Sequence, residues 1–376
     1  MAKNKKSNTR REFLMKSMFA MTATVVGAKA SKGADLGMYS SNVGAASEVG
    51  AIEMSLEQAR KHKQAFKYVS QEVKNAICEM TPAQIKKIRR NVWKKYLQRN
   101  EALVENHKKN SGKWKVHMLG TCAGMEPWEG RNHTSLILQK PSGELLWFDA
   151  GEYCSWTAVK MGIDITQCKH MFLAHPHGDH IGGITGFILS KSKIQWVMNA
   201  IGKKKINYGD IFIHTSVAHP VEGAIKQVWA KDSVPSIKVP LIENGKIYED
   251  EDVEIEALAN THMPMYKGKP QSYSFKIRLL KEKKVIVFSG DIRNSLELAP
   301  FFEKECCDLL IIEAAHTTLD KWLTDLKKDY FDKIKDIATM HYGVHYEFFP
   351  EVEIALAEKA WGKPLIWTQD RQTIVL

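Results

Sequence analysis

The sequence predicts an α/β protein whose larger, C-terminal part is a sandwich of sheets and helices. From Trp114 onward, short apolar runs of strand type recur and end in Gly, Asp or His. Beyond residue 183, strand-like and helix-like stretches alternate, as they do in α/β domains. A short strand leading into a Gly-bounded turn is expected over 116–124. Further strands are expected over 131–138, 144–152, 171–174, 253–258, 271–277, 284–291, 308–315 and 337–341.

A metal-binding loop is predicted at the end of the apolar run 171–174. His175, His177, Asp179 and His180 place three imidazoles and one carboxylate within six residues, and two glycines follow shortly after. Residues at alternate positions of an extended chain point to the same side, which groups the first two histidines. Imidazole and carboxylate suit zinc, iron or manganese, and the lack of Cys disfavours a purely structural site. A histidine-rich surface loop would need none of these features.

The spacing His-x-His-x-Asp-His over 175–180 resembles the signature of the metallo-β-lactamase fold superfamily. In that family the first two histidines bind one metal, and the Asp and the last His bind a second. The resemblance covers roughly residues 114–376. It implies an αββα four-layer sandwich, with two mixed sheets face to face, helices outside, and metals at the edge where the strand ends gather.

Three distal residues complete the ligand set that the resemblance implies. His262, Asp291 and His341 each follow or end a strand-like run. His262 would be the third ligand of the first metal, His341 the last ligand of the second, and Asp291 the carboxylate that bridges both. Any one distal His also fits a hydrogen-bonded core or surface position, so the prediction depends on their order at strand ends. The implied cofactors are two divalent ions, zinc first, with manganese or iron as alternatives.

Several segments resemble ribonuclease Z within this superfamily. They are Leu119-Gly120-Thr121, Arg131-Asn132 with Ser135, Asp149-Ala150-Gly151-Glu152 and Ser272-Tyr273. Asp149 would then be an outer carboxylate that steadies the metal loop. Taken alone, Asp149 also fits a turn or helix N-cap residue.

The implied proton donor is less well defined. Glu313 aligns with the Glu of the family's His-Glu-Ala-Thr segment, although Ile312 stands where that His would be. The family's additional histidine lies in a His-Ser-Thr segment, which this chain lacks. His316, in a His-Thr-Thr segment, and His345 are the two candidates for its role.

The resemblance implies hydrolysis of a phosphodiester by a metal-bridging hydroxide, with Asp179, Glu313 and His316 or His345 in the catalytic set. Many ribonucleases Z have a long RNA-gripping arm between the two strands that residues 278–283 join here. A small phosphodiester or nucleotide-type substrate is therefore favoured, with RNA left open. The alternatives are sulfate esters, lactones or thioesters on the same site, or a polyanion-binding protein with a degenerate site. Homodimerisation is also left open.

The N-terminal part differs in charge from the rest. Residues 1–113 carry 23 of the 54 Lys and Arg residues but 9 of the 43 Asp and Glu residues. Residues 51–113 are predicted to be a basic helical extension, with helix starts at Ser55 and at Thr81-Pro82. Its basic face either contacts polyanions or membranes or, as we favour, is solvated while an apolar stripe packs on the larger part.

Residues 1–30 resemble a twin-arginine signal peptide. Arg10-Arg11 follows a basic start, an apolar stretch comes next, and Ala28-Lys29-Ala30 offers a cleavage site. A basic tail with a chance Arg-Arg pair is the alternative. Residues 31–50, rich in Gly, Ala and Ser, are predicted to be a flexible linker. The expected partner is the twin-arginine export machinery and the expected location is periplasmic or secreted, with no transmembrane anchor after cleavage.

Overall fold

The computed structural model describes residues 112–124, 130–200, 210–228, 236–344, 346 and 350–376, together with five residues of the N-terminal part. The chain divides into two compact units, Met1–Ile88 and Arg89–Leu376. The predicted signal peptide, the linker and nearly all of the basic extension lie outside the described residues. In the first unit, the predicted helix start is visible at Thr81. Its hydroxyl accepts a hydrogen bond from the Gln84 backbone N–H, and the Gln84 side chain accepts one from the Thr81 backbone N–H, which is a capping box.

Within the described part of the second unit, the strands form two mixed sheets of seven strands each. The first sheet has the order β14-β1-β2-β3-β4-β5-β6 and the second the order β13-β12-β11-β10-β9-β8-β7. The strands of the first sheet are β1 (Lys115–Gly120), β2 (Ser135–Gln139), β3 (Leu145–Phe148), β4 (Cys168–Phe172), β5 (Ile211–His214), β6 (Ile237–Lys238) and β14 (Thr373–Val375). Those of the second are β7 (Gly245–Glu249), β8 (Val253–Ala259), β9 (Tyr273–Leu279), β10 (Lys284–Phe288), β11 (Cys307–Ala314), β12 (Ile334–Tyr342) and β13 (Ile366–Trp367).

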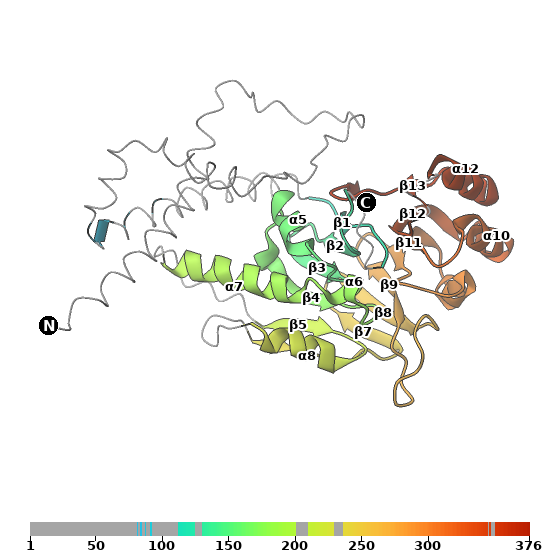
Figure 1. Cartoon of the computed structure of the whole chain (residues 1–376). Helices are drawn as coiled ribbons and strands as arrows, with labels where there is room; N and C mark the ends of the chain where they lie inside the picture. The colour runs from blue at the N-terminus through green and yellow to red at the C-terminus, as the bar shows by residue number, and fades with distance from the viewer. Residues whose placement is uncertain are drawn as a thin grey trace, which may run out of the picture. The chain divides into compact units, whose positions relative to one another are not determined.

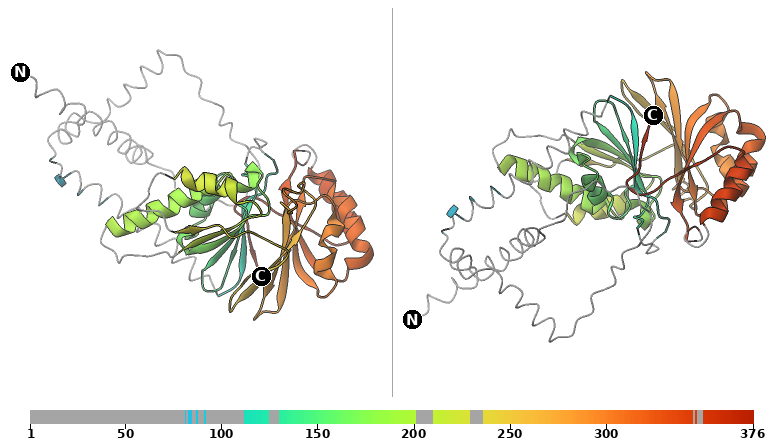
Figure 2. Two further views of the ribbon diagram at one scale, coloured as in Figure 1. Left: turned by 90° about the horizontal axis from the view of Figure 1, so that it is seen from below. Right: turned by 90° about the horizontal axis from the view of Figure 1, so that it is seen from above.

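Helices cover the outer face of each sheet (Figures 1 and 2). Outside the first sheet lie α5 (Cys154–Lys160), α7 (Ile184–Ala200) and α8 (Ala218–Lys226), with the short η2 (Ile165–Gln167). Outside the second lie α9 (Ala299–Phe302), α10 (Leu319–Tyr330) and α12 (Pro350–Trp361), with η3 (Ser295–Leu298). Within the described residues, one further short helix, α6 (Gly178–Ile181), belongs to the metal loop. The predicted αββα four-layer sandwich is therefore confirmed.

Three apolar cores explain why so many strands are hydrophobic along their whole length. Successive strand residues point to opposite faces, so a strand between a sheet and a helix layer buries both. Phe148 faces the second sheet, where its ring lies 5.7 Å from that of Phe275. Its neighbour Trp147 faces the helices and contacts Phe187 of α7, with ring centroids 5.0 Å apart. A third core joins the second sheet to α10 and α12.

Strand directions bring the predicted site residues to one edge of the sandwich. In the first sheet β3, β4 and β5 are parallel, and in the second β10, β11 and β12 are parallel, with β8 running the same way across β9. The carboxyl ends of parallel strands meet at one edge, which is where ligand sites form in such sheets. The loops after β3, β4, β8, β10 and β11 and the end of β12 therefore gather there.

Several predicted strands are shorter than expected, and the run 131–138 differs most at its start. The run 131–138 was expected to be extended throughout, but β2 begins at Ser135. The guanidinium of Arg131 instead lies 4.3 Å from the ring centroid of Tyr342 and donates to the Thr121 hydroxyl, and the backbone N–H of Asn132 donates to Asp370. These polar contacts keep residues 131–134 from pairing as a strand.

Among the described residues, no helix has the length and apolar character needed to cross a membrane.

Candidate metal centre

Close backbone packing shapes the metal loop after β4. The Ala174 N–H donates to Asp149 Oδ1 at 2.7 Å, which fixes the chain where it leaves the strand. A Cβ on Gly183 would lie 2.2 Å from the Gly151 carbonyl oxygen, and one on Gly151 would lie 2.5 Å from the Asp179 carbonyl oxygen. Only glycine fits such approaches, so Gly151 and Gly183 let α6 press against the end of β3.

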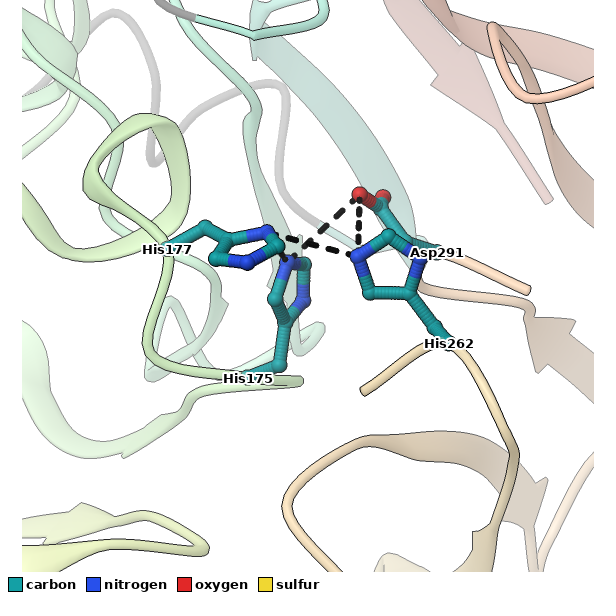
Figure 3. A group of neighbouring side chains, drawn as sticks. All are labelled: His175, His177, His262 and Asp291. Carbon is teal, nitrogen blue, oxygen red and sulfur yellow. Dashed lines mark hydrogen bonds and ion pairs between the residues drawn. The ribbon is translucent and has the colours of Figure 1, made fainter. Parts of the chain in front are cut away.

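The first group of donor atoms combines the metal loop with two loops of the second sheet (Figure 3). His177 Nδ1 lies 2.9 Å from His175 Nε2 and 3.3 Å from His262 Nε2. Asp291 Oδ2 lies 3.5 Å from His175 Nε2 and 3.6 Å from His262 Nε2. These four residues each offer one ligand atom to the same small space.

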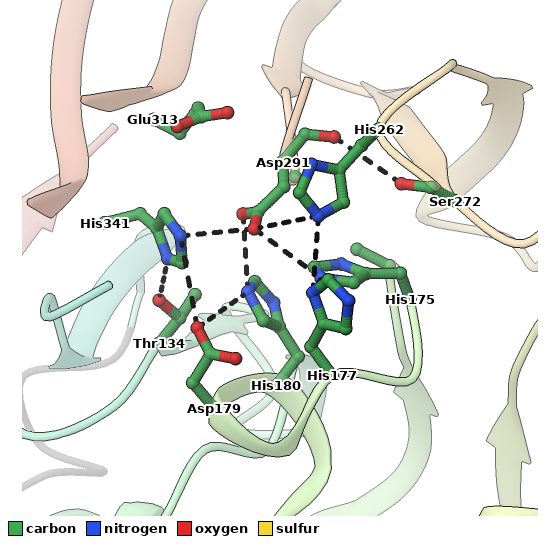
Figure 4. A network of polar contacts seen from close by, with 12 residues as sticks. Thr134, His175, His177, Asp179, His180, His262, Ser272, Asp291, Glu313 and His341 are labelled. Atoms are coloured by element: carbon green, nitrogen blue, oxygen red, sulfur yellow. Dashed lines mark hydrogen bonds and ion pairs between the residues drawn. The ribbon is translucent and has the colours of Figure 1, made fainter. Parts of the chain in front are cut away.

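The second group lies on the other side of the same aspartate (Figure 4). His180 Nε2 is 3.3 Å from Asp291 Oδ1 and 3.4 Å from Asp179 Oδ2. His341 Nε2 is 3.2 Å from Asp291 Oδ2 and 4.0 Å from Asp179 Oδ2. All seven residues predicted as ligands therefore lie in these two groups, and the Asp291 carboxylate stands between them.

Two buried atoms that face each other without a hydrogen bond indicate that the donor groups fit metal ions. His180 Nε2 and Asp291 Oδ1 are buried and make no hydrogen bond. Buried polar atoms are normally satisfied, because leaving one unmet costs free energy. The donors are imidazole nitrogens and carboxylate oxygens without thiolates, which is the chemistry that zinc, manganese or iron accepts. A cation between His180 and Asp291 would supply the missing partner of both atoms.

Outer residues hold the donor side chains in place. Asp149 Oδ2 accepts from His180 Nδ1 at 2.8 Å, which is the role predicted for this carboxylate. Two further contacts were not anticipated from the sequence. The Thr134 hydroxyl is hydrogen-bonded to His341 Nδ1, and the Gly124 backbone N–H donates to Asp179 Oδ2 at 2.8 Å. Ligand imidazoles are commonly oriented through their second nitrogen in this way.

Burial and charge set the protonation of the donors. Burial lowers the pKa of His175 and His177, and it lowers the pKa of His262 to about 4. Burial would raise the pKa of Asp291, but the nearby charges of His180, His341 and His175 outweigh it and hold that pKa well below its usual value. His175, His177, His262 and Asp291 are thus shifted toward the forms that metals bind, neutral imidazole and carboxylate. Burial would also lower the pKa of His180, but the charges of Asp291 and Asp149 raise it well above its usual value, so this ring must release a proton when a metal binds.

A Glu–His pair lies beside the donor groups. The buried Glu313 accepts from the backbone N–H of Ile292 at 2.8 Å and of Ala315 at 3.1 Å. His316 Nδ1 lies 2.8 Å from the Glu313 carboxylate, and its Nε2 lies 3.9 Å from Asp291 Oδ2. Burial would lower the pKa of His316, but the hydrogen bond and charge of Glu313 raise it. His345, the other candidate for this role, lies outside the described residues.

A family model decides the classification of the chain. The model described as Anti-Pycsar protein Apyc1 matches residues 114–354, which span all the site residues named above. The chain belongs to this family. The chain also resembles ribonuclease Z sequences. It is 28% identical to ribonuclease Z of a Cyanothece strain over 148 residues, or 39% of this chain and 43% of that protein. It is 24% identical to that of Nitrosopumilus maritimus over 286 residues, or 62% of this chain and 90% of that protein.

The chain spans about half the length of the first curated ribonucleases Z that it matches. These similarities are therefore partial. Among solved structures, the metallo-β-lactamase fold protein YhfI from Bacillus subtilis superposes with a TM-score of 0.52 at 18% identity, covering 70% of this chain and all of that one. This likeness shows the fold. The Apyc1-family chain thus has the metallo-β-lactamase fold and a distant sequence similarity to ribonuclease Z.

Proposed function

We propose that the protein is a phosphodiesterase that uses two divalent metal ions, zinc first, on a small phosphodiester or nucleotide-type substrate. The observation that carries the proposal is the position of Asp291. Its Oδ1 faces His180, while its Oδ2 faces His175, His262 and His341. Asp291 therefore contacts both donor groups, through Oδ2 to the first group and through both oxygens to the second, and one carboxylate shared by two groups is what a pair of ions about 3.5–4 Å apart requires.

The residues around Asp291 have different roles in the proposed hydrolysis. When bound, two divalent cations would supply Lewis acidity and a nucleophile derived from water. Asp149 and Thr134 keep the Nε2 atoms of His180 and His341 turned toward Asp291. Asp179 is held by the Gly124 N–H and keeps one carboxylate oxygen among the donors.

His316 is the proposed proton donor. Its Nδ1–H donates to the Glu313 carboxylate, so Nε2 is directed into the site, and the raised pKa of the ring favours its protonated form. A proton at Nε2 can pass to the leaving oxygen as the phosphorus–oxygen bond breaks. Glu313 orients the ring and stabilises its charged form, while its own contacts to backbone N–H groups fix it in the strand end.

The connection between β9 and β10 supports a small substrate. Leu279 ends β9 and Lys284 begins β10, so a tight turn joins the two strands. An RNA-gripping arm would have to be inserted there. A substrate recognised mainly at the metal centre is therefore favoured over a folded RNA.

Elemental analysis and a substrate screen test the proposal together. Purified protein is assayed for metal per chain and for turnover of bis(p-nitrophenyl) phosphate, cyclic nucleotides, a phosphomonoester, a sulfate ester and a lactone. We expect about two ions per chain and a preference for phosphodiesters. Turnover confined to sulfate esters, lactones or thioesters would move the reaction to the alternative class. Tight RNA binding without stoichiometric metal would favour the polyanion-binding alternative.

We also propose export by the twin-arginine pathway, on the order of features in residues 1–30. Arg10→Lys with Arg11→Lys should leave an uncleaved precursor in the cytoplasm, as seen by fractionation and N-terminal sequencing. Full-length wild-type protein found only in the cytosol would contradict export.

A further inference from the structure

An exposed arginine lies beside the metal centre, and the proposed mechanism does not use it. Arg293 follows two residues after Asp291, so their Cα atoms are at most about 7 Å apart. Although the residue is exposed, its side chain does not extend freely into solvent. Its Nε donates to the backbone carbonyl of His262 at 3.3 Å. The guanidinium is thereby held against the loop of a second predicted ligand.

The neighbouring carboxylate is already engaged by other groups. Glu297 accepts from the Thr261 hydroxyl and from the backbone N–H groups of Thr261 and Arg293. These bonds fasten the His262 loop to the Asp291 loop without using the Arg293 side chain. In the described part of the chain, no carboxylate forms an ion pair with the Arg293 guanidinium, and its two terminal nitrogens donate to no protein group.

We propose that Arg293 binds the anionic oxygens of the substrate at the metal centre. A guanidinium held through Nε keeps a planar fork of terminal N–H groups, which matches two oxygens of a phosphate. Tying Nε to the ligand loop removes much of the rotational freedom that an exposed arginine would lose on binding. This assignment rests on the proposed phosphodiesterase function. Arg293 would then determine specificity, because it favours anionic esters over neutral ones.

The alternative is that Arg293 only ties two loops together. A tie would act through the carbonyl of His262, so removing it would loosen the donor groups and reduce metal content. Turnover of charged and neutral substrates would then fall by the same factor. An anion-binding role predicts the opposite pattern, with metal retained and the loss confined to anionic ligands.

The test compares Arg293→Met and Arg293→Lys with the wild type in the metal-loaded full chain. KM and kcat are measured with bis(p-nitrophenyl) phosphate and with the neutral ester p-nitrophenyl acetate, and inorganic phosphate is titrated by calorimetry. For Arg293→Met we expect unchanged metal content, unchanged acetate turnover, and a KM for the diester and a Kd for phosphate raised about tenfold or more. Arg293→Lys should recover part of the loss, since it keeps the charge but not the fork.

Lys335→Met is the matched control, because Lys335 is an exposed cation at the start of β12, six residues and about 20 Å from His341 at its other end. It should leave every value unchanged, which excludes a general effect of net charge. Unchanged diester KM and phosphate Kd in Arg293→Met would overturn the assignment, as would metal loss with equal effects on both esters. Failure of the proposed function can be told apart from failure of this assignment. If the wild type is inactive on every phosphodiester, the phosphate titrations still decide whether Arg293 binds anions.

Discussion

Substituting Asn for Asp291 tests the two-metal arrangement most directly. The amide keeps the shape of the side chain but removes the charge shared by the two donor groups. Two unit charges 4 Å apart interact by about 4 kcal/mol at an effective dielectric constant of 20. Because about 1.4 kcal/mol changes an equilibrium constant tenfold, at least one ion should bind about a thousandfold more weakly. Asp291→Asn should therefore fold, lose at least one metal equivalent and lose most of its turnover.

The assay is metal per chain by elemental analysis, measured beside phosphodiester turnover and the far-ultraviolet circular dichroism spectrum. Two companion variants locate the loss. Asp179→Asn should affect the second ion preferentially, and His175→Ala the first, because each residue belongs to only one donor group. Full metal occupancy with near-normal turnover in Asp291→Asn would refute the two-metal mechanism and leave only the fold.

Three further variants separate catalysis, ligand orientation and packing. Glu313→Gln should retain both ions and lose rate most with poor leaving groups, which a series of substituted phenyl phosphodiesters would measure; equal losses along the series would argue against proton donation by the Glu–His pair. Asp149→Asn should weaken metal affinity about 10–100-fold, as measured by competition with a chelating dye, and unchanged affinity would show that the outer carboxylate is dispensable. Gly290→Ala should lower the free energy of unfolding by about 1–3 kcal/mol in denaturant titrations, since the added Cβ would lie 2.9 Å from the Cβ of Ala174. Gly143→Ala, at another positive φ but with nothing within 4 Å, measures the backbone cost alone, and an equal loss in both variants would rule out the steric explanation.

The sequence predicted the parts of the site that depend on local spacing. His175, His177, Asp179 and His180 are close in the chain, so their pattern could be seen before any fold was known. The more distant ligands were predicted because a strand end is itself a local signal, and the superfamily resemblance supplied their order. The sandwich was predicted from short, continuously apolar runs that alternate with helix-like stretches. Such runs are typical of strands that are buried on both faces.

Contacts between residues far apart in the chain could not be predicted from local sequence patterns. Thr134 bonds to His341 across more than 200 residues, and the Gly124 contact to Asp179 uses only a main-chain N–H. The choice between His316 and His345 was likewise undecidable from spacing. The structure places His316 on the Glu313 carboxylate, whereas His345 lies outside the described residues. Arg131 was expected in a strand because its contact with Tyr342, more than 200 residues away, could not be seen in the local pattern.

The division of the site between two sheets has a consequence for folding. Strands β1 to β6 come before β7 to β13 in the chain, so nearly all of each sheet is built from a continuous segment. His175, His177 and His180 come from one segment, and His262, Asp291 and His341 from the other. Each sheet can therefore form its local hairpins and crossovers first, but neither donor group is complete until the two sheets dock. Tight metal uptake should follow the docking step, so a metal-responsive signal in refolding experiments should appear with the last kinetic phase, after most of the secondary structure has formed.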